Sequence, residues 1–169
     1  MAVYYFDASA MVKYYVPEPG STWGRQLIEA WDAESEQARH HIFIAEITRV
    51  EVAAGLAVIE RIGRIKRAER EREYRRFNSQ LVHRYAIIPL TTGDLETAAR
   101  LTQTHPLKAY DAVQLAVALR HRQLLASYQH AVTFVCSDHT LLTAAQAERL
   151  LTDNPFDHVS PHDTLESSG

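Results

Sequence analysis

Short apolar runs alternate with amphipathic stretches along most of the chain. Residues 3–6 form an apolar run of β-branched and aromatic side chains, which is typical of a buried strand. Runs of the same kind predict strands at residues 41–45, 85–90 and 133–136, and a weaker run predicts a last strand at residues 156–159.

The stretches between these runs have the spacing of helices. Ile47, Val50, Ala54, Val58 and Ile62 recur at intervals of three and four, which predicts an amphipathic helix with these side chains as its apolar face. The other predicted helices cover residues 9–16, 21–31, 61–76, 92–105, 108–125 and 141–151. The helix predicted at 61–76 mixes many basic residues with glutamates, so part of its charge is expected to be paired within the helix.

Strands that alternate with helices indicate an α/β fold, in which a central parallel sheet is covered by helices on both faces. A chain of 169 residues with 46% hydrophobic residues is long enough for one domain with its own core. We expect this domain to span residues 1–159, and we expect residues 160–169 to form a frayed polar C-terminal tail.

The composition narrows the classes of protein. A net charge of −3 means that binding of nucleic acid would depend on a local basic patch or a bound metal. Cys136 is the only cysteine, which excludes an intramolecular disulfide and a cysteine-based zinc site. No apolar run reaches the about 18 residues of a membrane span, and Asp7 interrupts the apolar run that a secretory signal would need. A soluble, cytoplasmic protein without membrane contact is therefore expected.

Four acidic residues have small or apolar neighbours: Asp7, Glu51, Asp111 and Asp138. Asp7 and Asp138 each follow a predicted strand, and ligands of parallel sheets bind beyond the carboxyl ends of the strands. Both also fit a simpler role, because an aspartate between a strand and a helix often caps the helix. Asp111 suits the positive end of a helix dipole, and a glutamate such as Glu51 is commonly a solvated helix residue.

The four acids together favour a bound cation. Two carboxylates about 4 Å apart repel each other by about 4 kcal/mol at an effective dielectric constant of about 20. Four carboxylates in one site would therefore need a cation to neutralise them, and hard oxygen ligands favour Mg²⁺ or Mn²⁺. Spacing along the chain does not by itself establish that the four residues converge.

Four segments resemble, in the same order, the acidic motifs of PIN-domain nucleases, and more narrowly those of the VapC toxins of bacterial and archaeal toxin–antitoxin pairs. The segments read FDASAMVK (residues 6–13), TRVE (48–51), AYDAVQLA (109–116) and VCSDHTLL (135–142). The resemblance extends from Tyr4 to about Ala145. The fourth segment is the loosest match, because it contains Cys136 and His139 at positions where the family varies.

The resemblance implies a three-layer α/β/α sandwich and an Mg²⁺- or Mn²⁺-dependent endoribonuclease that acts as the toxin of a toxin–antitoxin pair. It assigns both catalysis and metal binding to Asp7, Glu51, Asp111 and Asp138, with Ser9 as a supporting hydroxyl. It also implies cleavage to a 5′-phosphate and a 3′-hydroxyl, a homodimer, and inhibition by a cognate antitoxin protein.

Two other classes of function remain open at this stage. A non-catalytic PIN-fold protein would bind RNA or a regulatory partner without cleaving RNA. A phosphoryl-transfer domain is less compatible with the chain, since Ser9 occupies the position where dehalogenase-like phosphatases have a second aspartate. The predicted basic helix at 61–76 and Lys13 are candidate contacts to the RNA backbone, although the helix also fits a solvated, self-paired surface.

Overall fold

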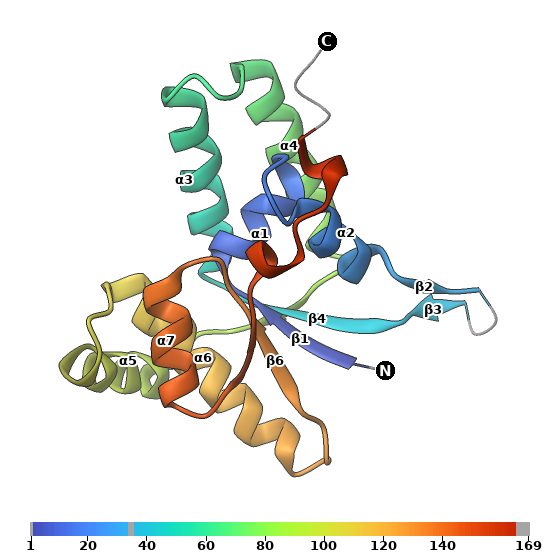
Figure 1. Cartoon of the computed structure of the whole chain (residues 1–169). Helices are drawn as coiled ribbons and strands as arrows, with labels where there is room; N and C mark the ends of the chain where they lie inside the picture. Colours follow the sequence, from blue (N-terminus) through green and yellow to red (C-terminus); the bar gives the residue numbers. More distant parts are fainter. Residues whose placement is uncertain (1, 34–35, 165–169) are drawn as a thin grey trace.

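The computed structural model describes residues 2–33 and 36–164, and its centre is a sheet of parallel strands (Figure 1). Within the described residues the main sheet has five strands in the order β5-β4-β1-β6-β7. Their bounds are β1 Ala2–Phe6, β4 His40–Ala45, β5 Ala86–Ile88, β6 Val132–Val135 and β7 Leu151–Asp153. The first strand of the chain therefore lies in the middle of the sheet, where it pairs with β4 on one side and β6 on the other.

Side chains along the central strand alternate between two hydrophobic cores. Val3 and Tyr5 point into one core, whereas Tyr4 and Phe6 pack in the other. This alternation follows from the strand geometry, in which successive side chains lie on opposite faces. A sheet that is apolar on both faces must be covered on both, and this explains the two helical layers.

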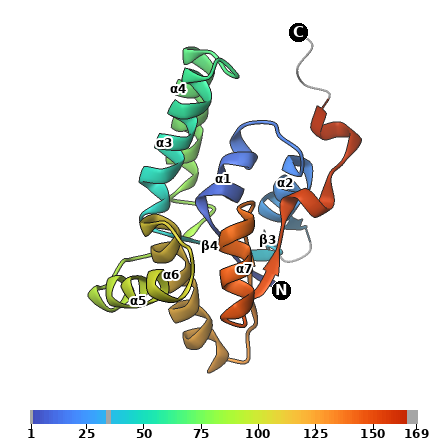
Figure 2. The same cartoon turned by 60° about the vertical axis from the view of Figure 1, so that its left-hand side comes forward.

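The helices divide between the two faces of the sheet, as Figures 1 and 2 show from two directions. One layer consists of α1 Ala8–Tyr15, α2 Ser21–Glu29, α3 Thr48–Arg61 and α4 Arg67–Gln80. The other consists of α5 Thr92–Thr104, α6 Ala109–Ala126 and α7 His139–Ala147. The predicted three-layer α/β/α architecture is confirmed. Among the described residues, no helix has the length and apolar character needed to cross a membrane.

The predicted apolar face of α3 is wrong. Val52, Leu56 and Ile59 are the buried apolar side chains of this helix, whereas Val50 and Val58 are exposed. The sequence of α3 carries apolar residues on two faces, so its periodicity alone does not identify the buried one. Packing against α1 determines which face of α3 is buried. The two helices are so close that a Cβ at Gly55 would lie 3.0 Å from Val12 Cγ2.

Three other elements differ from the prediction. The charged helix begins at Arg67, because Gly63 adopts a positive φ of 77° and separates it from α3. The predicted last strand at 156–159 is wrong, since β7 precedes it and Pro155–His158 forms a 3₁₀ helix, η1. A proline lacks the backbone N–H that pairing in a sheet requires. A short hairpin of β2 Trp31–Asp32 and β3 Gln37–Ala38 was not predicted.

The C-terminal segment is ordered beyond the predicted domain boundary. Pro161–Thr164 forms a second 3₁₀ helix, η2, and Asp163 is buried against the start of α2. The expectation of a frayed chain from residue 160 is therefore wrong for residues 160–164. Residues 165–169 of the predicted tail lie outside the described residues, and the boundary of the domain at residue 159 stays a prediction.

Candidate active site

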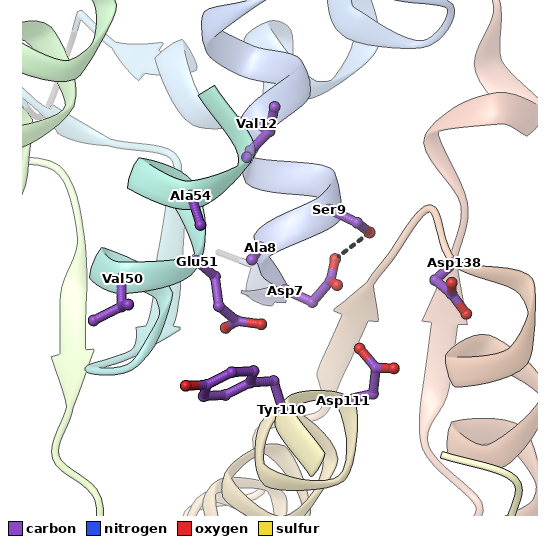
Figure 3. Close-up of a pocket in the computed structure, with 11 residues that line it drawn as sticks. Asp7, Ala8, Ser9, Val12, Val50, Glu51, Ala54, Tyr110, Asp111 and Asp138 are labelled. Atoms are coloured by element: carbon purple, nitrogen blue, oxygen red, sulfur yellow. Dashed lines mark hydrogen bonds between the residues drawn. The ribbon is translucent and has the colours of Figure 1, made fainter. Parts of the chain in front are cut away.

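The four acids singled out from the sequence line a single pocket at the carboxyl edge of the sheet (Figure 3). The pocket has a volume of about 330 Å³. Asp7 and Asp138 follow β1 and β6, while Glu51 and Asp111 lie in the first turns of α3 and α6. Because β1 and β6 are parallel neighbours, the residues that follow them reach the same edge of the sheet.

Asp7 combines the capping role with a place in the pocket. Its Oδ1 accepts hydrogen bonds from the Ala10 backbone N–H at 2.9 Å and from the Ser9 hydroxyl at 2.8 Å, so it caps α1. The Ser9 hydroxyl oxygen in turn accepts a bond from the Ser137 N–H in the loop that contains Asp138. The same aspartate therefore fixes the start of α1 and lines the pocket.

Glu51 is held by a buried glutamine. The Gln114 Nε2 group donates to Glu51 Oε2 at 2.5 Å and to Thr48 Oγ1 at 2.9 Å. On its other side, Gln114 Oε1 accepts a bond from the Tyr5 hydroxyl at 2.7 Å. The amide thus links β1, α6 and the first turn of α3, and it fixes the direction of the Glu51 side chain.

Asp111 and Asp138 lie on the opposite side of the pocket from Glu51 (Figure 3). Asp138 caps α7 by accepting a bond from the Leu141 N–H at 2.9 Å. Its own N–H donates to the sulfur of Cys136 at 3.2 Å, so the buried thiol helps to shape the loop. The negative charge of Asp138 contributes to raising the pKa of Asp111, after desolvation, which is the larger cause.

The electrostatics of the pocket disfavour negative charge. Burial raises the pKa of Asp7 to about 6, although hydrogen bonds from Ala10 and Ser9 counteract part of the effect. Burial also raises the pKa of Glu51 to about 7, and the charges of Asp7 and Asp111 add to this shift. Carboxylates that lose hydration without gaining a positive partner hold their protons more tightly. The pocket therefore favours either protonation or a cation.

The donor set suits a hard divalent cation. Among the described residues that line the pocket, four are carboxylates and none is Lys, Arg or His. Within the described part of the chain, however, no three Asp, Glu, His or Cys side chains are close enough to form a ready-made cation site. This geometry is compatible with Mg²⁺, which commonly takes one or two carboxylates and keeps several waters. Asp7, Glu51, Asp111 and Asp138 are the residues that could hold it.

The predicted basic contacts are engaged elsewhere. Lys13 is only 4% exposed, and its Nζ lies 2.7 Å from Glu18 Oε2 and 3.9 Å from the centre of the Phe156 ring. On α4, arginines pair with glutamates within the helix or on neighbouring elements, as Arg67 does with Glu71. These ion pairs favour the self-paired interpretation of the helix over a free basic surface.

Two residues of the site were not singled out from the sequence. Gln114 is part of the third acidic motif but was not predicted to belong to the site. As the one polar residue of the apolar run 112–118, it indicates a buried side chain that needs hydrogen-bond partners. Tyr110 lines the pocket beside Asp111, together with the apolar residues Val50 and Ala54 of α3. No sequence pattern distinguishes such a tyrosine from a core aromatic residue.

Comparison with known proteins adds an independent observation. The family model of the PIN domain matches residues 4–130 of the chain. Ribonuclease VapC47 of Mycobacterium tuberculosis (strain CDC 1551 / Oshkosh) is 29% identical over 154 residues, which covers 89% of this chain and 96% of that protein.

Two solved structures share the fold. One is a chain from the crystal structure of VapBC2 of Rickettsia felis bound to a DNA fragment of the VapBC2 promoter. It has a TM-score of 0.58 and 14% identity, with 90% of this chain and 98% of that chain covered. A chain of a toxin–antitoxin complex from Klebsiella pneumoniae has a TM-score of 0.58 and 20% identity, with 92% and 98% covered. At these identities the likeness concerns the fold.

Proposed function

Because this chain belongs to the PIN-domain family, as its motifs predicted, we propose that it is a metal-dependent endoribonuclease and the toxin of a toxin–antitoxin pair. One observation carries the proposal: four carboxylates from separate segments line one pocket that contains no basic side chain among its described residues. The similarity to a VapC ribonuclease along most of both chains supports RNA as the substrate.

Asp7, Glu51, Asp111 and Asp138 are proposed to hold Mg²⁺ or Mn²⁺. When bound, such an ion lowers the pKa of water and neutralises charge on the phosphodiester oxygens. Asp7 and Asp138 each cap a helix through Oδ1, and the second oxygen of each is the proposed ligand. Gln114 donates to one oxygen of Glu51, and the other oxygen is the proposed ligand of the ion. The expected products are a 5′-phosphate and a 3′-hydroxyl.

The proposal includes partners that follow from the family. A cognate antitoxin is supported by the fold shared with toxin–antitoxin complexes. A homodimer and a cytoplasmic location complete the proposal. A short reading frame that encodes a DNA-binding antitoxin, directly upstream of the gene for this chain, would support the pairing.

Cleavage of RNA by the purified protein tests the proposal. We expect cutting of single-stranded RNA with Mg²⁺ or Mn²⁺, and loss of cutting with a chelator. Removing one ligand charge in Asp7→Asn or Asp111→Asn should lower kcat by on the order of 100-fold, since a metal ligand contributes several kcal/mol to transition-state stabilisation.

Asp157→Asn is the matched control, because this exposed aspartate lies outside the pocket and should leave cleavage unchanged. Equal cleavage by the Asp7 and Asp111 variants would contradict the assignment. Tight binding of RNA without metal-dependent cleavage, by protein that is properly folded, would instead favour the non-catalytic alternative.

A further inference from the structure

We propose that the apolar wall of the pocket, formed by Tyr110, Val50 and Ala54, is a subsite for the nucleobase next to the cleaved phosphodiester. This inference rests on the proposed ribonuclease function and adds a binding contact to it. The occupant is a base of the RNA strand, stacked on the Tyr110 ring.

Hydrogen bonds between α6 and α3 determine where Tyr110 lies. Gln114 is one helical turn after Tyr110, so the two side chains share a face of α6. Because Gln114 is bonded to Thr48 and Glu51, this face of α6 is fixed against the first turn of α3. Tyr110 consequently lies in the pocket next to Asp111, with its ring close to Glu51 (Figure 3).

The wall is open to solvent, unlike the aromatic side chains of the two hydrophobic cores. Tyr110 is 55% exposed and Val50 is 61% exposed, and Ala54 is exposed as well. Within the part of the chain that the structure describes, the Tyr110 hydroxyl has no hydrogen-bond partner. By contrast, the buried hydroxyl of Tyr5 is bonded to Gln114. More than half of the Tyr110 surface is therefore open to a ligand.

The two sides of the pocket match the two chemical parts of a nucleotide. The side of the pocket with Asp7, Asp111 and Asp138 suits a phosphodiester that is approached through a cation. The side with Tyr110 and the aliphatic residues around Glu51 suits a flat, apolar base. Single-stranded nucleic acids commonly bind in this way, with bases stacked on aromatic side chains. An RNA strand whose phosphate reaches the acids brings the adjoining base to the wall.

The lining also predicts how selective the subsite is. Among the described pocket residues, no Arg, Lys, Asn or Gln is available to read the edges of a base. Stacking is tolerant of sequence because every base has an aromatic face. We therefore expect all four bases to bind here, with purines favoured by their larger area.

Steady-state kinetics with a matched pair of RNAs test the inference. One probe is a short single-stranded RNA of mixed sequence, cut by the wild-type protein with Mn²⁺ at a mapped position. The other is the same RNA with base-free ribose on both sides of that position. On the intact RNA, Tyr110→Ala should raise KM about tenfold with kcat little changed, because stacking of one base contributes about 1–3 kcal/mol and about 1.4 kcal/mol is tenfold.

Three comparisons make the result specific. Tyr110→Phe keeps the ring and should restore the wild-type KM. Tyr128→Ala is the control, since Tyr128 is 68% exposed but follows the far end of α6 and lies outside the pocket. On the base-free RNA, the wild-type protein and Tyr110→Ala should have the same KM.

The outcomes separate this inference from the proposed function. If wild-type protein cuts the RNA and Tyr110→Ala has an unchanged KM on the intact probe, the nucleobase subsite is overturned while the ribonuclease stands. If the wild-type protein does not cut RNA with Mn²⁺, the proposed function fails and the subsite fails with it.

Discussion

At the scale of single residues, Asp7 both caps a helix and lines the candidate pocket. Asp7 Oδ1 caps α1, yet burial of the same carboxylate raises its pKa to about 6. A helix cap stabilises the folded chain, whereas a buried charge without a cation destabilises it. Without a bound cation, the buried charge of Asp7 should therefore lower the free energy of unfolding at neutral pH.

The pH dependence of stability should report the cost at Asp7. Its pKa is 3.8 when unperturbed and about 6 in the folded protein, so between these values the folded state binds more protons than the unfolded state. The contribution of Asp7 to the free energy of unfolding is then highest below about pH 4. It decreases until about pH 6, by on the order of 3 kcal/mol. Asp7→Asn removes this contribution and keeps the cap, because asparagine caps helices as well as aspartate does.

Denaturant unfolding with a chelator present, at a series of pH values from about 4 to about 8, measures this effect. The variant should gain stability relative to the wild-type protein as the pH rises. Glu51, whose pKa is about 7, should still lower the free energy of unfolding of both proteins as the pH rises. Parallel pH profiles for the wild-type and Asp7→Asn proteins would exclude a raised pKa at Asp7.

Gln114 should be essential for metal affinity although it is not itself a ligand. Gln114→Leu leaves Glu51 without its donor, and loss of a residue that orients a ligand typically weakens metal binding by about 10–100-fold. Calorimetric titration of the protein with Mn²⁺, without RNA, measures the change.

Tyr5→Phe is the matched control, because it removes the bond on the other side of Gln114 and leaves the Glu51 contact in place. It should lower the free energy of unfolding by about 1 kcal/mol with little effect on Mn²⁺ affinity. Unaltered Mn²⁺ affinity in Gln114→Leu would show that Glu51 needs no such support.

At the scale of elements, the start of α2 depends on a residue near the other end of the chain. Gly20 is at the N-cap and has no side chain to accept hydrogen bonds. Asp163 replaces it, since its Oδ2 accepts from the Gly20 N–H at 2.8 Å and its Oδ1 from the Thr22 N–H at 2.7 Å. Gly20 has a φ of 87°, and a Cβ there would lie 2.2 Å from Pro155 O. The first residue of η1 therefore packs directly against this glycine.

Asp163→Ala should therefore destabilise the protein as the loss of a helix cap does. The expected decrease in the free energy of unfolding is about 1–2 kcal/mol, and Asp163→Asn should retain part of the stability. Thermal unfolding at neutral pH measures both values, with Asp157→Ala as the exposed control. If Asp163→Ala melts with the wild-type protein, the contact with α2 does not contribute to stability.

At the scale of the whole molecule, the site requires the entire fold. Its four acids come from residues 7 to 138, and only the parallel sheet and the helices packed on it bring them to one pocket. A ligand that binds the folded protein but not the unfolded chain stabilises the folded state. Cation binding should therefore be visible as an increase in the global Tm.

Mn²⁺ should raise the Tm of the wild-type protein at about pH 8. At a concentration about 100 times its Kd, the expected stabilisation is about 2.7 kcal/mol. The increase should disappear at about pH 5, where Asp7 and Glu51 are largely protonated, and in Asp7→Asn at any pH. A monovalent salt of equal ionic strength is the control, and an equal increase with that salt would argue against a specific site.

Much of the fold could be predicted from the sequence because the relevant patterns are local. A strand that is buried on both faces is apolar throughout, and the run at residues 3–6 predicted β1 for that reason. The chain order of strands and helices then implied a parallel sheet, whose carboxyl edge receives the residues that follow β1 and β6. The positions of Asp7 and Asp138 followed from this rule alone.

The sequence by itself thus determined the strands β1, β4, β5 and β6, the layers and the edge at which these two aspartates lie. Only the tertiary structure decided which stripe of α3 is buried, because the partner that covers Leu56 rather than Val58 lies elsewhere in the chain. It also decided that Gln114 supports Glu51, that Asp163 caps α2 and that Tyr110 lies in the pocket. These contacts join residues distant in sequence, and local propensity carries no information about such pairs.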